Sequence, residues 1–468
     1  MTKIGLEIHC QLTSLQSKLF CPCKADYREF RPNANICPIC MGIPGSLPRL
    51  NQEAVKKATT IAMALNCKTP DSIIFFRKNY FYPDLPKNFQ ITQLNIYEDT
   101  SIGGSGSVMI GGKKINISRI QLEEDPGRLI YEGSSAQNMT TMVDYNRAGT
   151  ALVEIVTEPD FENPRQVRDF LEMISDLLEN LNVSDPSLEG AMRADANVSI
   201  EGGKKVEIKN IGSFYELEKA VRFEMARQQN LHSRGMQIAQ ETRHWDDKRR
   251  ITVSSRSKEE EHDYRYFLEG DIPRIIIDSG TRSKLSKDMP ESIDARRNRY
   301  VSEYGISSQA ADVLASDKFH SGLFENAHDK SNAKEIANII TTDLMGLVDT
   351  REKKNDCKVT AAHLREMADA IISGDISRSS AKTALHEIVK TGKQFAKVAA
   401  EKDLGNVTDE SSLSKVILKI VKDEQQAVRQ TKSNPQAINF LVGKVMKETG
   451  GKADPNLTLT LLKKAISE

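Results

Sequence analysis

The chain has 468 residues, in which 65 Lys and Arg side chains balance 65 Asp and Glu side chains. This length exceeds what one hydrophobic core usually organises, so we expect two or three domains. The balanced charge excludes a protein held on nucleic acid or membrane by its overall charge, so any RNA contact must come from local basic patches. No run approaches the roughly 20 apolar residues of a membrane span, and a strand pattern starts at once, so we expect a cytoplasmic protein.

The first segment, GLEIHCQL at residues 5–12, alternates strictly between apolar and polar side chains. This period of two predicts a β-strand with one face in the core. The apolar positions are Leu6, Ile8, Cys10 and Leu12. The opposite face carries Glu7 and His9, which are close enough on a pleated strand to reach one ligand. Taken alone, the pattern also fits a half-buried strand with a solvated polar face.

Four of the seven cysteines cluster in two short pairs, in the sequences CPC and CPIC. They are Cys21, Cys23, Cys37 and Cys40. In a reducing compartment such pairs indicate zinc rather than disulfides, because four thiolates complete a tetrahedral site. With no open coordination position, the predicted zinc is structural and ties together residues 20–41.

Strand patterns dominate the chain to about residue 290. Two segments, 106–120 and 196–211, each place Gly-Gly between alternating runs, which predicts two β-hairpins. Helical periodicity interrupts the strands at 51–66, after Asn163 and Pro164, and after the predicted capping box at 213–216. The fold class predicted for this part is α+β with an antiparallel sheet.

From about residue 292 the pattern becomes helical, with short helices predicted at 359–373 and 376–390. A further amphipathic run begins near residue 409. We therefore expect three domains: an α+β domain at 1–291, an all-α domain at 292–400 and a small helical tail at 401–468.

Six mixed-charge segments rich in Gly, Pro and Tyr lie between residues 77 and 273, and they are too polar for a core. Their carboxylates are Glu123, Glu124, Asp125, Glu154 and Glu158, and their cations are Lys78, Arg147, Arg193, Lys209 and Arg265. Carboxylates with an imidazole can hold Mg²⁺ or Mn²⁺, and Lys and Arg can neutralise phosphate, so the set fits an ATP-using site. Salt bridges on the surface would account for the same charges.

Seven ordered blocks resemble the B subunits of the tRNA-dependent amidotransferases. They read GLEIHCQL, RKNYFYPDLPK, LEEDPGR, YNRAGTALVEIVTEPD, MRADANVSI, EIKNIGSF and DYRYF. The resemblance covers essentially the whole chain. It implies a cradle domain, a helical domain and a helical tail that contacts tRNA. In the tail, Lys415, Lys419, Lys422 and Arg429 offer positive charge, although a solvated helix face explains them equally well.

The resemblance also implies site residues and cofactors. Glu7 and His9 match the floor of the cradle, and His9, Glu124 and Glu154 match ligands of Mg²⁺, for which Mn²⁺ would suit the imidazole better. As catalytic residues we therefore predict Glu7, His9, Glu124 and Glu154. Lys78, Arg193 and Arg265 are predicted to contact ATP phosphate or substrate carboxylate.

The implied reaction transfers the γ-phosphoryl group of ATP to the side chain of Glu-tRNA(Gln) or Asp-tRNA(Asn), and ammonia then displaces the phosphate. The implied partners are a glutaminase (amidase) of the same complex, its A subunit, which supplies ammonia, a small C subunit, and the charged tRNA. The alternative is a zinc-stapled, tRNA-binding accessory protein without catalysis.

Overall fold

The computed structural model describes residues 2–95, 100–132, 140–255, 264–405, 410–433, 436, 438–449, 453 and 455–467. The chain divides into two compact units, Met1–Pro290 and Glu291–Glu468. The first is built around an antiparallel-rich sheet and the second is helical, which confirms the predicted α+β class with helical regions. The finer division into three domains stays a prediction. None of the helices in the described residues is long and apolar enough to cross a membrane.

All strands in the described part of the chain lie in the first unit. The strands are β1 (Lys3–Gln11), β2 (Ser72–Ile73), β3 (Phe76–Asn79), β4 (Phe89–Thr92), β5 (Gly103–Ile110), β6 (Lys113–Glu124), β7 (Arg128–Glu132), β8 (Thr140–Asp144), β9 (Ala151–Thr157), β10 (Met192–Ser199), β11 (Val206–Lys209), β12 (Glu241–Asp246), β13 (Ile251–Ser254), β14 (Phe267–Leu268) and β15 (Ile275–Ile276). The helices are α1 (Gln52–Ala64), α2 (Pro164–Asn180), α3 (Phe214–Ser233) and α4 (Ser279–Asp288).

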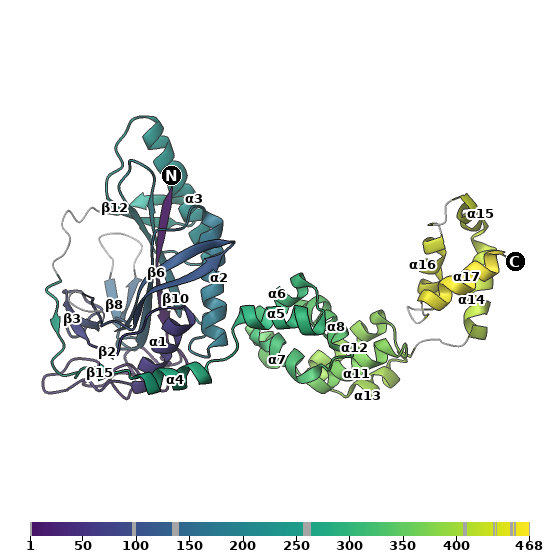
Figure 1. Cartoon of the computed structure of the whole chain (residues 1–468), viewed down its shortest axis with the longest axis horizontal. Helices are drawn as coiled ribbons and strands as arrows, with labels where there is room; N and C mark the ends of the chain where they lie inside the picture. The colour runs from purple at the N-terminus through teal and green to yellow at the C-terminus, as the bar shows by residue number, and fades with distance from the viewer. Residues whose placement is uncertain are drawn as a thin grey trace. The chain divides into compact units, whose positions relative to one another are not determined.

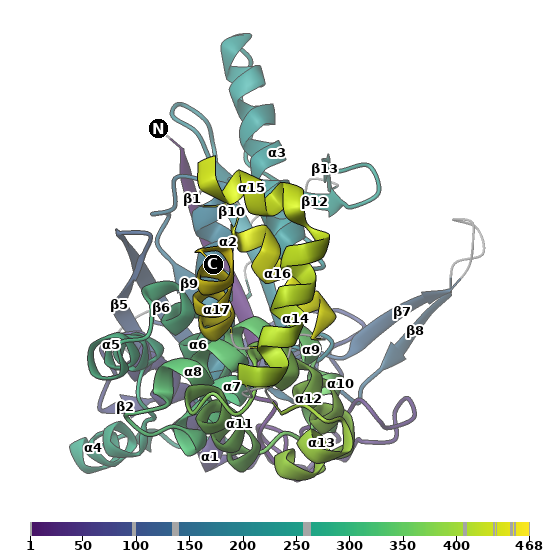
Figure 2. The same cartoon turned by 90° about the vertical axis from the view of Figure 1, so that its right-hand side faces the viewer.

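Eight of these strands form one sheet in the order β13-β12-β11-β10-β1-β9-β6-β5, and β1 lies near its middle (Figure 1). Neighbouring strands are antiparallel except for the parallel pair β11 and β12. Strands β14-β3-β4 form a smaller sheet and β15-β2 a separate pair, and β4 contacts β6 of the large sheet through the hydrogen bond from Gln90 Nε2 to the Glu124 carbonyl oxygen. Strands β7 and β8 pair with each other and extend as a ribbon (Figure 2).

Both predicted hairpins are confirmed. Strands β5 and β6 pair across Gly111 and Gly112, whose φ angles of 55° and 81° lie in the left-handed region that glycine adopts without strain. Strands β10 and β11 also pair antiparallel. The sequence signal was sufficient because each turn brings together strands that are adjacent along the chain.

The helix starts follow the predicted caps. The Asn163 side chain accepts a hydrogen bond from the Gln166 amide, and Pro164 occupies the first turn of α2. The Ser213 side chain likewise accepts from the Glu216 amide at the start of α3. The Glu216 carboxylate instead accepts hydrogen bonds from the Lys219 and Trp245 side chains, so tertiary contacts replace the reciprocal half of the predicted capping box.

One face of the large sheet is packed in the core. The even-numbered side chains of β1 are buried there together with Phe170 of α2 and Leu217 of α3. Figure 1 shows α2 and α3 running along this side of the sheet. Since the helices cover one face, the other face is available for the polar side chains that alternate with the core positions.

The second unit consists of short helices. They are α5 (Ile293–Tyr304), α6 (Ser308–Ser316), α7 (Lys318–Ala327), α8 (Ala333–Asn338), the π-helix η1 (Ile339–Leu344), α9 (Met345–Leu347), α10 (Arg351–Asp356), α11 (Ala361–Ile372), α12 (Arg378–Thr391), α13 (Phe395–Glu401), α14 (Glu410–Asp423), α15 (Gln425–Ser433), α16 (Ile438–Glu448) and α17 (Pro455–Ser467). The helices predicted at 359–373 and 376–390 are confirmed as α11 and α12. Buried side chains form two clusters, one between residues 300 and 404 and one between 413 and 462.

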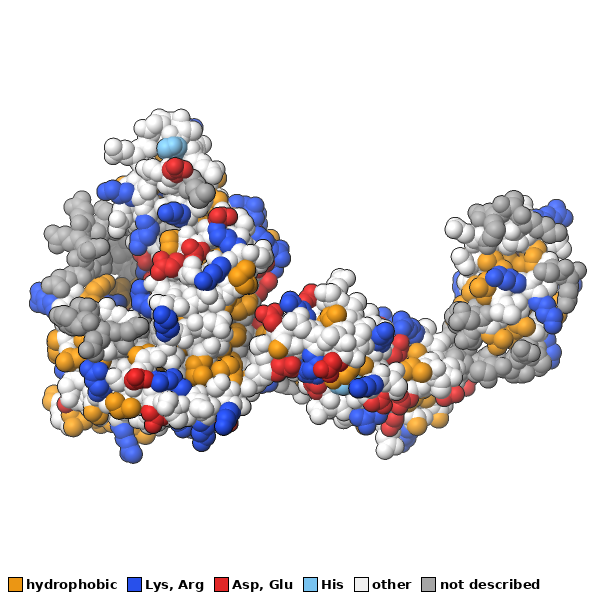
Figure 3. All heavy atoms as spheres, in the orientation of Figure 1, with side chains coloured by type: hydrophobic (Ala, Val, Ile, Leu, Met, Phe, Trp, Pro, Cys, Tyr) orange, Lys and Arg blue, Asp and Glu red, His pale blue; other side chains and the backbone are white. Residues whose placement is uncertain are grey.

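Basic and acidic side chains are mixed on the face of the protein drawn in Figure 3. The predicted basic residues of the tail, Lys415, Lys419, Lys422 and Arg429, are all exposed. Lys419 already pairs with Glu448 at 2.7 Å. The helical tail therefore offers exposed positive charge that is partly neutralised within the tail itself.

Candidate functional site

A row of polar side chains crosses the uncovered face of the large sheet. His9 of β1 lies opposite Arg193 on β10 and opposite Glu154 on β9. Glu154 in turn lies opposite Gln121 on β6. Residues that face each other across neighbouring strands have side chains on the same side of the sheet. Four strands that are far apart in the sequence thus align their polar side chains.

Three residues of this face form a cluster suited to a metal ion. One ligand atom from each of Glu7, His9 and Glu154 lies within 4.8 Å of the others. The Nε2 atom of His9 is 3.6 Å from Glu7 Oε1 and 3.9 Å from Glu123 Oε1. Carboxylate oxygens and a ring nitrogen are donors that Mn²⁺ and, less commonly, Mg²⁺ accept in proteins. The residues therefore fit a divalent cation.

The electrostatics of this cluster favour a cation as well. Burial lowers the pKa of His9 to about 4, so the imidazole is neutral and its nitrogen lone pair is available. Burial, together with the nearby Glu154 carboxylate, raises the pKa of Glu123 to about 8. Burial and the Glu7 charge also raise the pKa of Glu154. Several carboxylates crowded in one buried place repel each other, and a divalent cation between them would relieve that repulsion.

The cluster lies on the wall of a cavity of about 860 Å³. This size is typical of sites for small ligands and leaves room for a nucleotide. Arg119 and Lys78 also line the cavity. Arg119 Nη2 is 3.3 Å from Glu154 Oε1, and Lys78 Nζ lies 4.6 Å from the centre of the Tyr264 ring. The cavity thus combines a carboxylate cluster with cations able to bind phosphate.

A third cation that lines the cavity, Arg193, is held in place by the buried carboxylate of Asp125. Asp125 is buried and accepts hydrogen bonds from Arg193 Nη2 at 2.9 Å and from Gln11 Nε2 at 2.7 Å, while Arg147 Nε lies 3.7 Å away. Burial alone would raise the pKa of Asp125, but the two guanidinium groups keep it below its ordinary value. The Nε atom of Arg193 is buried and has no protein partner among the described residues. A fixed guanidinium with a spare donor is suited to an anionic ligand.

A second charged group lines the cavity beside Glu7, which lies opposite Asp195 across strands β1 and β10. Lys209 Nζ lies 3.1 Å from Glu207 Oε1 and 3.6 Å from Asp195 Oδ2. Burial raises the pKa of Asp195 to about 6. The walls of the cavity therefore carry charges of both signs.

The structure does not place the predicted ligand Glu124 in this cluster, so its role as a ligand stays a prediction. Its carboxylate oxygens accept hydrogen bonds from Lys87 Nζ at 2.5 and 2.6 Å and from the Ile91 amide at 2.8 Å. It lines a different, smaller cavity of about 180 Å³ beside Cys40. The reason is strand alternation, because Glu124 has the same parity as the core residue Leu122, whereas Glu123 faces the large cavity.

The structure does not place Arg265 on the wall of the large cavity, so its predicted contact stays a prediction. Its side chain is exposed and it is not among the residues that line the large cavity, whereas its neighbours Tyr264 and Tyr266 are. Lys78 and Arg193 do line the cavity, as predicted for residues that bind an anionic ligand. Sequence reasoning missed Glu123 as a neighbour of His9, although the alternation in QLEED indicated which of its two glutamates shares a face with Gln121.

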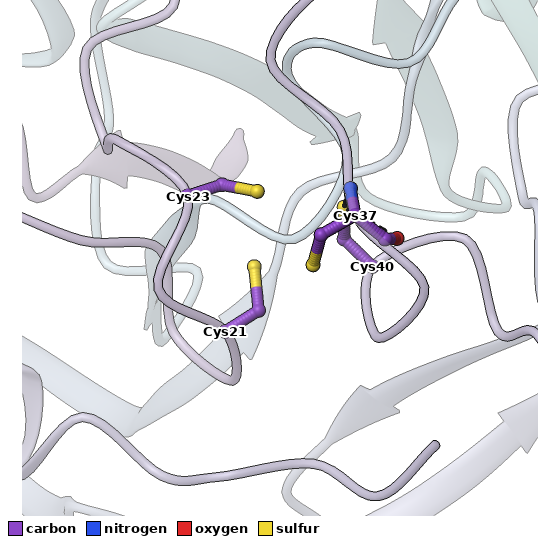
Figure 4. A group of neighbouring side chains, drawn as sticks. All are labelled: Cys21, Cys23, Cys37 and Cys40. Atoms are coloured by element: carbon purple, nitrogen blue, oxygen red, sulfur yellow. Dashed lines mark hydrogen bonds between the residues drawn. The ribbon is translucent and has the colours of Figure 1, made fainter. Parts of the chain in front are cut away.

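The second cluster is formed by the four predicted cysteines, whose Sγ atoms all lie within 4.8 Å of one another. Figure 4 shows the sulfur atoms of Cys21 and Cys23 directed toward the loop that carries Cys37 and Cys40. The Cys37 amide lies 3.1 Å from Cys40 Sγ. The pKa of Cys40 is lowered to about 5, first by the hydrogen bond from Cys21 and also by the charge of Lys18. Four convergent sulfurs with one thiolate already favoured fit a tetrahedral zinc ion.

Comparisons with known proteins agree along the whole chain. The family described as "GatB/GatE catalytic domain" matches residues 2–282, and the family described as "GatB domain" matches residues 322–466. Two similar proteins are named as B subunits of aspartyl/glutamyl-tRNA(Asn/Gln) amidotransferase. The one from Sulfurisphaera tokodaii is 46% identical over 100% of this chain and 99% of its own length. The one from Carboxydothermus hydrogenoformans is 39% identical over 99% of this chain and 98% of its own length.

Proposed function

The chain belongs to the family of aspartyl/glutamyl-tRNA(Asn/Gln) amidotransferase B subunits, and on this premise we propose that its large cavity carries out the ATP-dependent amidation of a tRNA-bound side chain. The substrate is Glu-tRNA(Gln) or Asp-tRNA(Asn), and the product carries the corresponding amide. The enzyme is thus a ligase that forms a carbon–nitrogen bond.

The observation that carries this proposal is the polar row on the sheet, in which His9 lies between Glu154 and Arg193. His9 and Glu154, together with Glu7, would hold a Mg²⁺ or Mn²⁺ ion. Such an ion neutralises charge on the phosphate oxygens of ATP. Lys78 and Arg193 line the same cavity and supply positive charge for the remaining phosphate or carboxylate oxygens.

The chemistry requires activation because a carboxylate has no suitable leaving group for attack by ammonia. Transfer of the γ-phosphoryl group from ATP to the side-chain oxygen gives an acyl phosphate and ADP. Ammonia then attacks the carbonyl carbon, the carbon–oxygen bond to phosphate breaks, and inorganic phosphate leaves as the amide forms. The role of this chain's residues is to hold both substrates in line and to neutralise phosphate charge.

We assign the four-cysteine cluster to a structural Zn²⁺ ion. Residues 20–41 contain turns and bends rather than helices or long strands, and few of their side chains are buried apolar groups. An ion held by Cys21, Cys23, Cys37 and Cys40 would tie this segment together without an open position for a substrate.

The proposed partners follow from the family. A glutaminase, the A subunit of the complex, would supply ammonia, a small C subunit would complete a heterotrimer, and the charged tRNA would contact the helical tail. Lys415, Lys422 and Arg429 are exposed there and offer contacts to phosphate. Because charged tRNA is used in translation, we place the reaction in the cytoplasm.

The test is ATP hydrolysis by the assembled enzyme with charged and uncharged tRNA. The proposal predicts that phosphate release requires tRNA charged with Glu or Asp and exceeds the rate with uncharged tRNA by at least about 100-fold, since the nucleophile is the side-chain carboxylate. Equal rates with both tRNAs, or no hydrolysis in a complex that still binds tRNA, would favour a non-catalytic accessory role.

A further inference from the structure

Lys18 is a fully buried lysine in the first unit, with an exposed fraction of 0%. Its Nζ donates a hydrogen bond to the Asn35 carbonyl oxygen at 2.9 Å. Its second contact is Cys40 Sγ at 3.9 Å. Among the described residues, no carboxylate oxygen forms an ion pair with this ammonium group; the nearby Glu124 carboxylate is taken by Lys87.

A buried ammonium group requires a counter-charge, because its removal from water is otherwise strongly unfavourable. A carbonyl oxygen supplies only a partial charge. The sulfur side of the contact supplies more, since four thiolates bound to one Zn²⁺ ion carry a net charge of about −2. The negative charge of the metal-bound thiolates and the positive charge of Lys18 would therefore be in direct contact.

The surrounding backbone fixes this contact. The Lys18 amide donates to the Cys23 carbonyl at 2.9 Å, and the Asn35 amide donates to the Asn146 side chain at 2.7 Å. A Cβ atom placed on Gly149 would lie 3.5 Å from Cys40 Cβ and 3.7 Å from Lys18 Cδ, so the two side chains pack on the same glycine. Lys18 is held beside the sulfur by both of the loops that carry cysteines and by the turn around Gly149.

We propose that Lys18 is the charge partner of the four-cysteine metal centre. Its ammonium group would contact the metal-bound sulfur of Cys40 without binding the metal itself. The inference rests on the zinc site proposed above. It implies that the ammonium group stabilises the metal-bound thiolates, and that the thiolates in turn allow the ammonium group to be buried. The relation is reciprocal, so it can be tested from the metal side and from the lysine side.

The metal-side test compares zinc affinity in three forms of the full chain by competition with a chromogenic chelator. Lys18→Met keeps the length of the side chain and removes its charge. Lys24→Met removes one charge from the same loop, but Lys24 is exposed. We expect Lys18→Met to weaken zinc binding by about 10–100-fold, the usual effect of losing an outer-shell partner, and Lys24→Met to change it by less than about twofold.

The lysine-side test uses the chain without metal, so that the outcome does not depend on zinc affinity. Cys40→Ala removes the sulfur that contacts Lys18 and leaves the ammonium group with the Asn35 carbonyl alone. Adding Lys18→Met to Cys40→Ala should then raise the thermal unfolding midpoint, because a buried unpaired charge is removed. If Lys18 served only to hydrogen bond Asn35, the second substitution would lower the midpoint further.

The outcomes separate the possible failures. If the unchanged protein binds no zinc, the proposed metal centre is wrong. If it binds zinc but Lys18→Met and Lys24→Met have equal affinities, the metal centre stands and the role of Lys18 is overturned. If Lys18→Met fails to fold by itself, a folded Cys40→Ala/Lys18→Met double variant still supports the proposal, and an unfolded double variant beside a folded Cys40→Ala overturns it.

Discussion

The two clusters of metal-binding side chains in the first unit are assembled in different ways. The cysteine cluster comes from one stretch between Cys21 and Cys40 and lies in irregular loops. The carboxylate–histidine cluster joins Glu7 and His9 to Glu154, which is far along the chain and is brought near by pairing of β1 with β9. A local cluster depends on spacing alone, whereas a distant one depends on the register of the sheet.

The difference also concerns what each cluster can do. Around the proposed Zn²⁺ ion, the four sulfurs would complete a tetrahedron and leave no position for a substrate, so we expect the first cluster to stabilise the fold. The second cluster lies on the wall of a cavity of about 860 Å³ beside Lys78 and Arg193, so an ion there can meet phosphate. Changes at the second should reduce activity, and changes at the first should reduce stability.

The largest expected effect is that of Glu154→Gln. It keeps the shape of the side chain but removes a charge from the cluster with Glu7 and His9. We expect amide formation on charged tRNA to fall by at least about 100-fold, because losing a ligand should cost no less than losing an outer-shell group. The matched control is Glu162→Gln, a surface residue paired with Lys113. If both variants retain full activity, the cluster does not serve the reaction.

Removal of zinc should have the next largest effect, and on stability. Stripping the metal with a chelator should destabilise the first unit by about 2 kcal/mol or more, which corresponds to about 4–8 °C in its unfolding midpoint. Cys37→Ser should reproduce this loss, whereas Cys357→Ser, at a half-buried cysteine of the second unit, should not. An unfolding midpoint that ignores the chelator would contradict the structural role of the metal.

A smaller effect is expected from Asp125→Asn, which weakens the hold on Arg193 but removes none of the three side chains of the carboxylate–histidine cluster. The guanidinium group would keep its charge but lose its buried ionic partner. We expect KM for ATP or for charged tRNA to rise about tenfold, as for loss of a charge-assisted hydrogen bond, with a smaller change in kcat. Asp26→Asn, at the exposed partner of Arg28, is the control. Unchanged KM values for both substrates would remove Arg193 from the binding site.

The smallest expected effect, that of Glu124→Gln, tests most sharply which glutamates bind the divalent cation. Glu124→Gln should change the affinity of the large cavity for Mn²⁺ by less than about twofold, because its carboxylate points to the opposite side of the strand and pairs with Lys87. Mn²⁺ binding is measured directly by electron paramagnetic resonance. A loss of affinity as large as that caused by Glu154→Gln would restore Glu124 to the ligand set.

The sequence predicted what is local in the fold. The alternation of β1, the two hairpins, the cap at Asn163 and the four cysteines are each decided within a few residues, and the structure confirms the elements. The order of the large sheet could not be derived in this way, because pairing of β1 with both β9 and β10 joins segments more than 140 residues apart.

The position of Glu124 outside the large cavity has a simple physical explanation. The motif alone indicated Glu124, without regard to the side of the backbone on which it lies. In QLEED, the apolar Leu122 is on the core side of the strand. Because side chains alternate, Glu124, two residues later, is on the same side as Leu122, and Glu123 faces the cavity. The role of Asp125 in holding Arg193 had no such signal, since the contact joins β10 to the end of β6 across the sheet.

The central claim is that a divalent cation binds between strands β1 and β9 and serves ATP. The most direct test is a crystal structure of the complex with a non-hydrolysable ATP analogue and Mn²⁺, examined for anomalous scattering. The account predicts a peak within about 2.3 Å of His9 Nε2 and of carboxylate oxygens of Glu7 and Glu154. A peak beside Glu124 instead, or a bound nucleotide with no metal near His9, would contradict it.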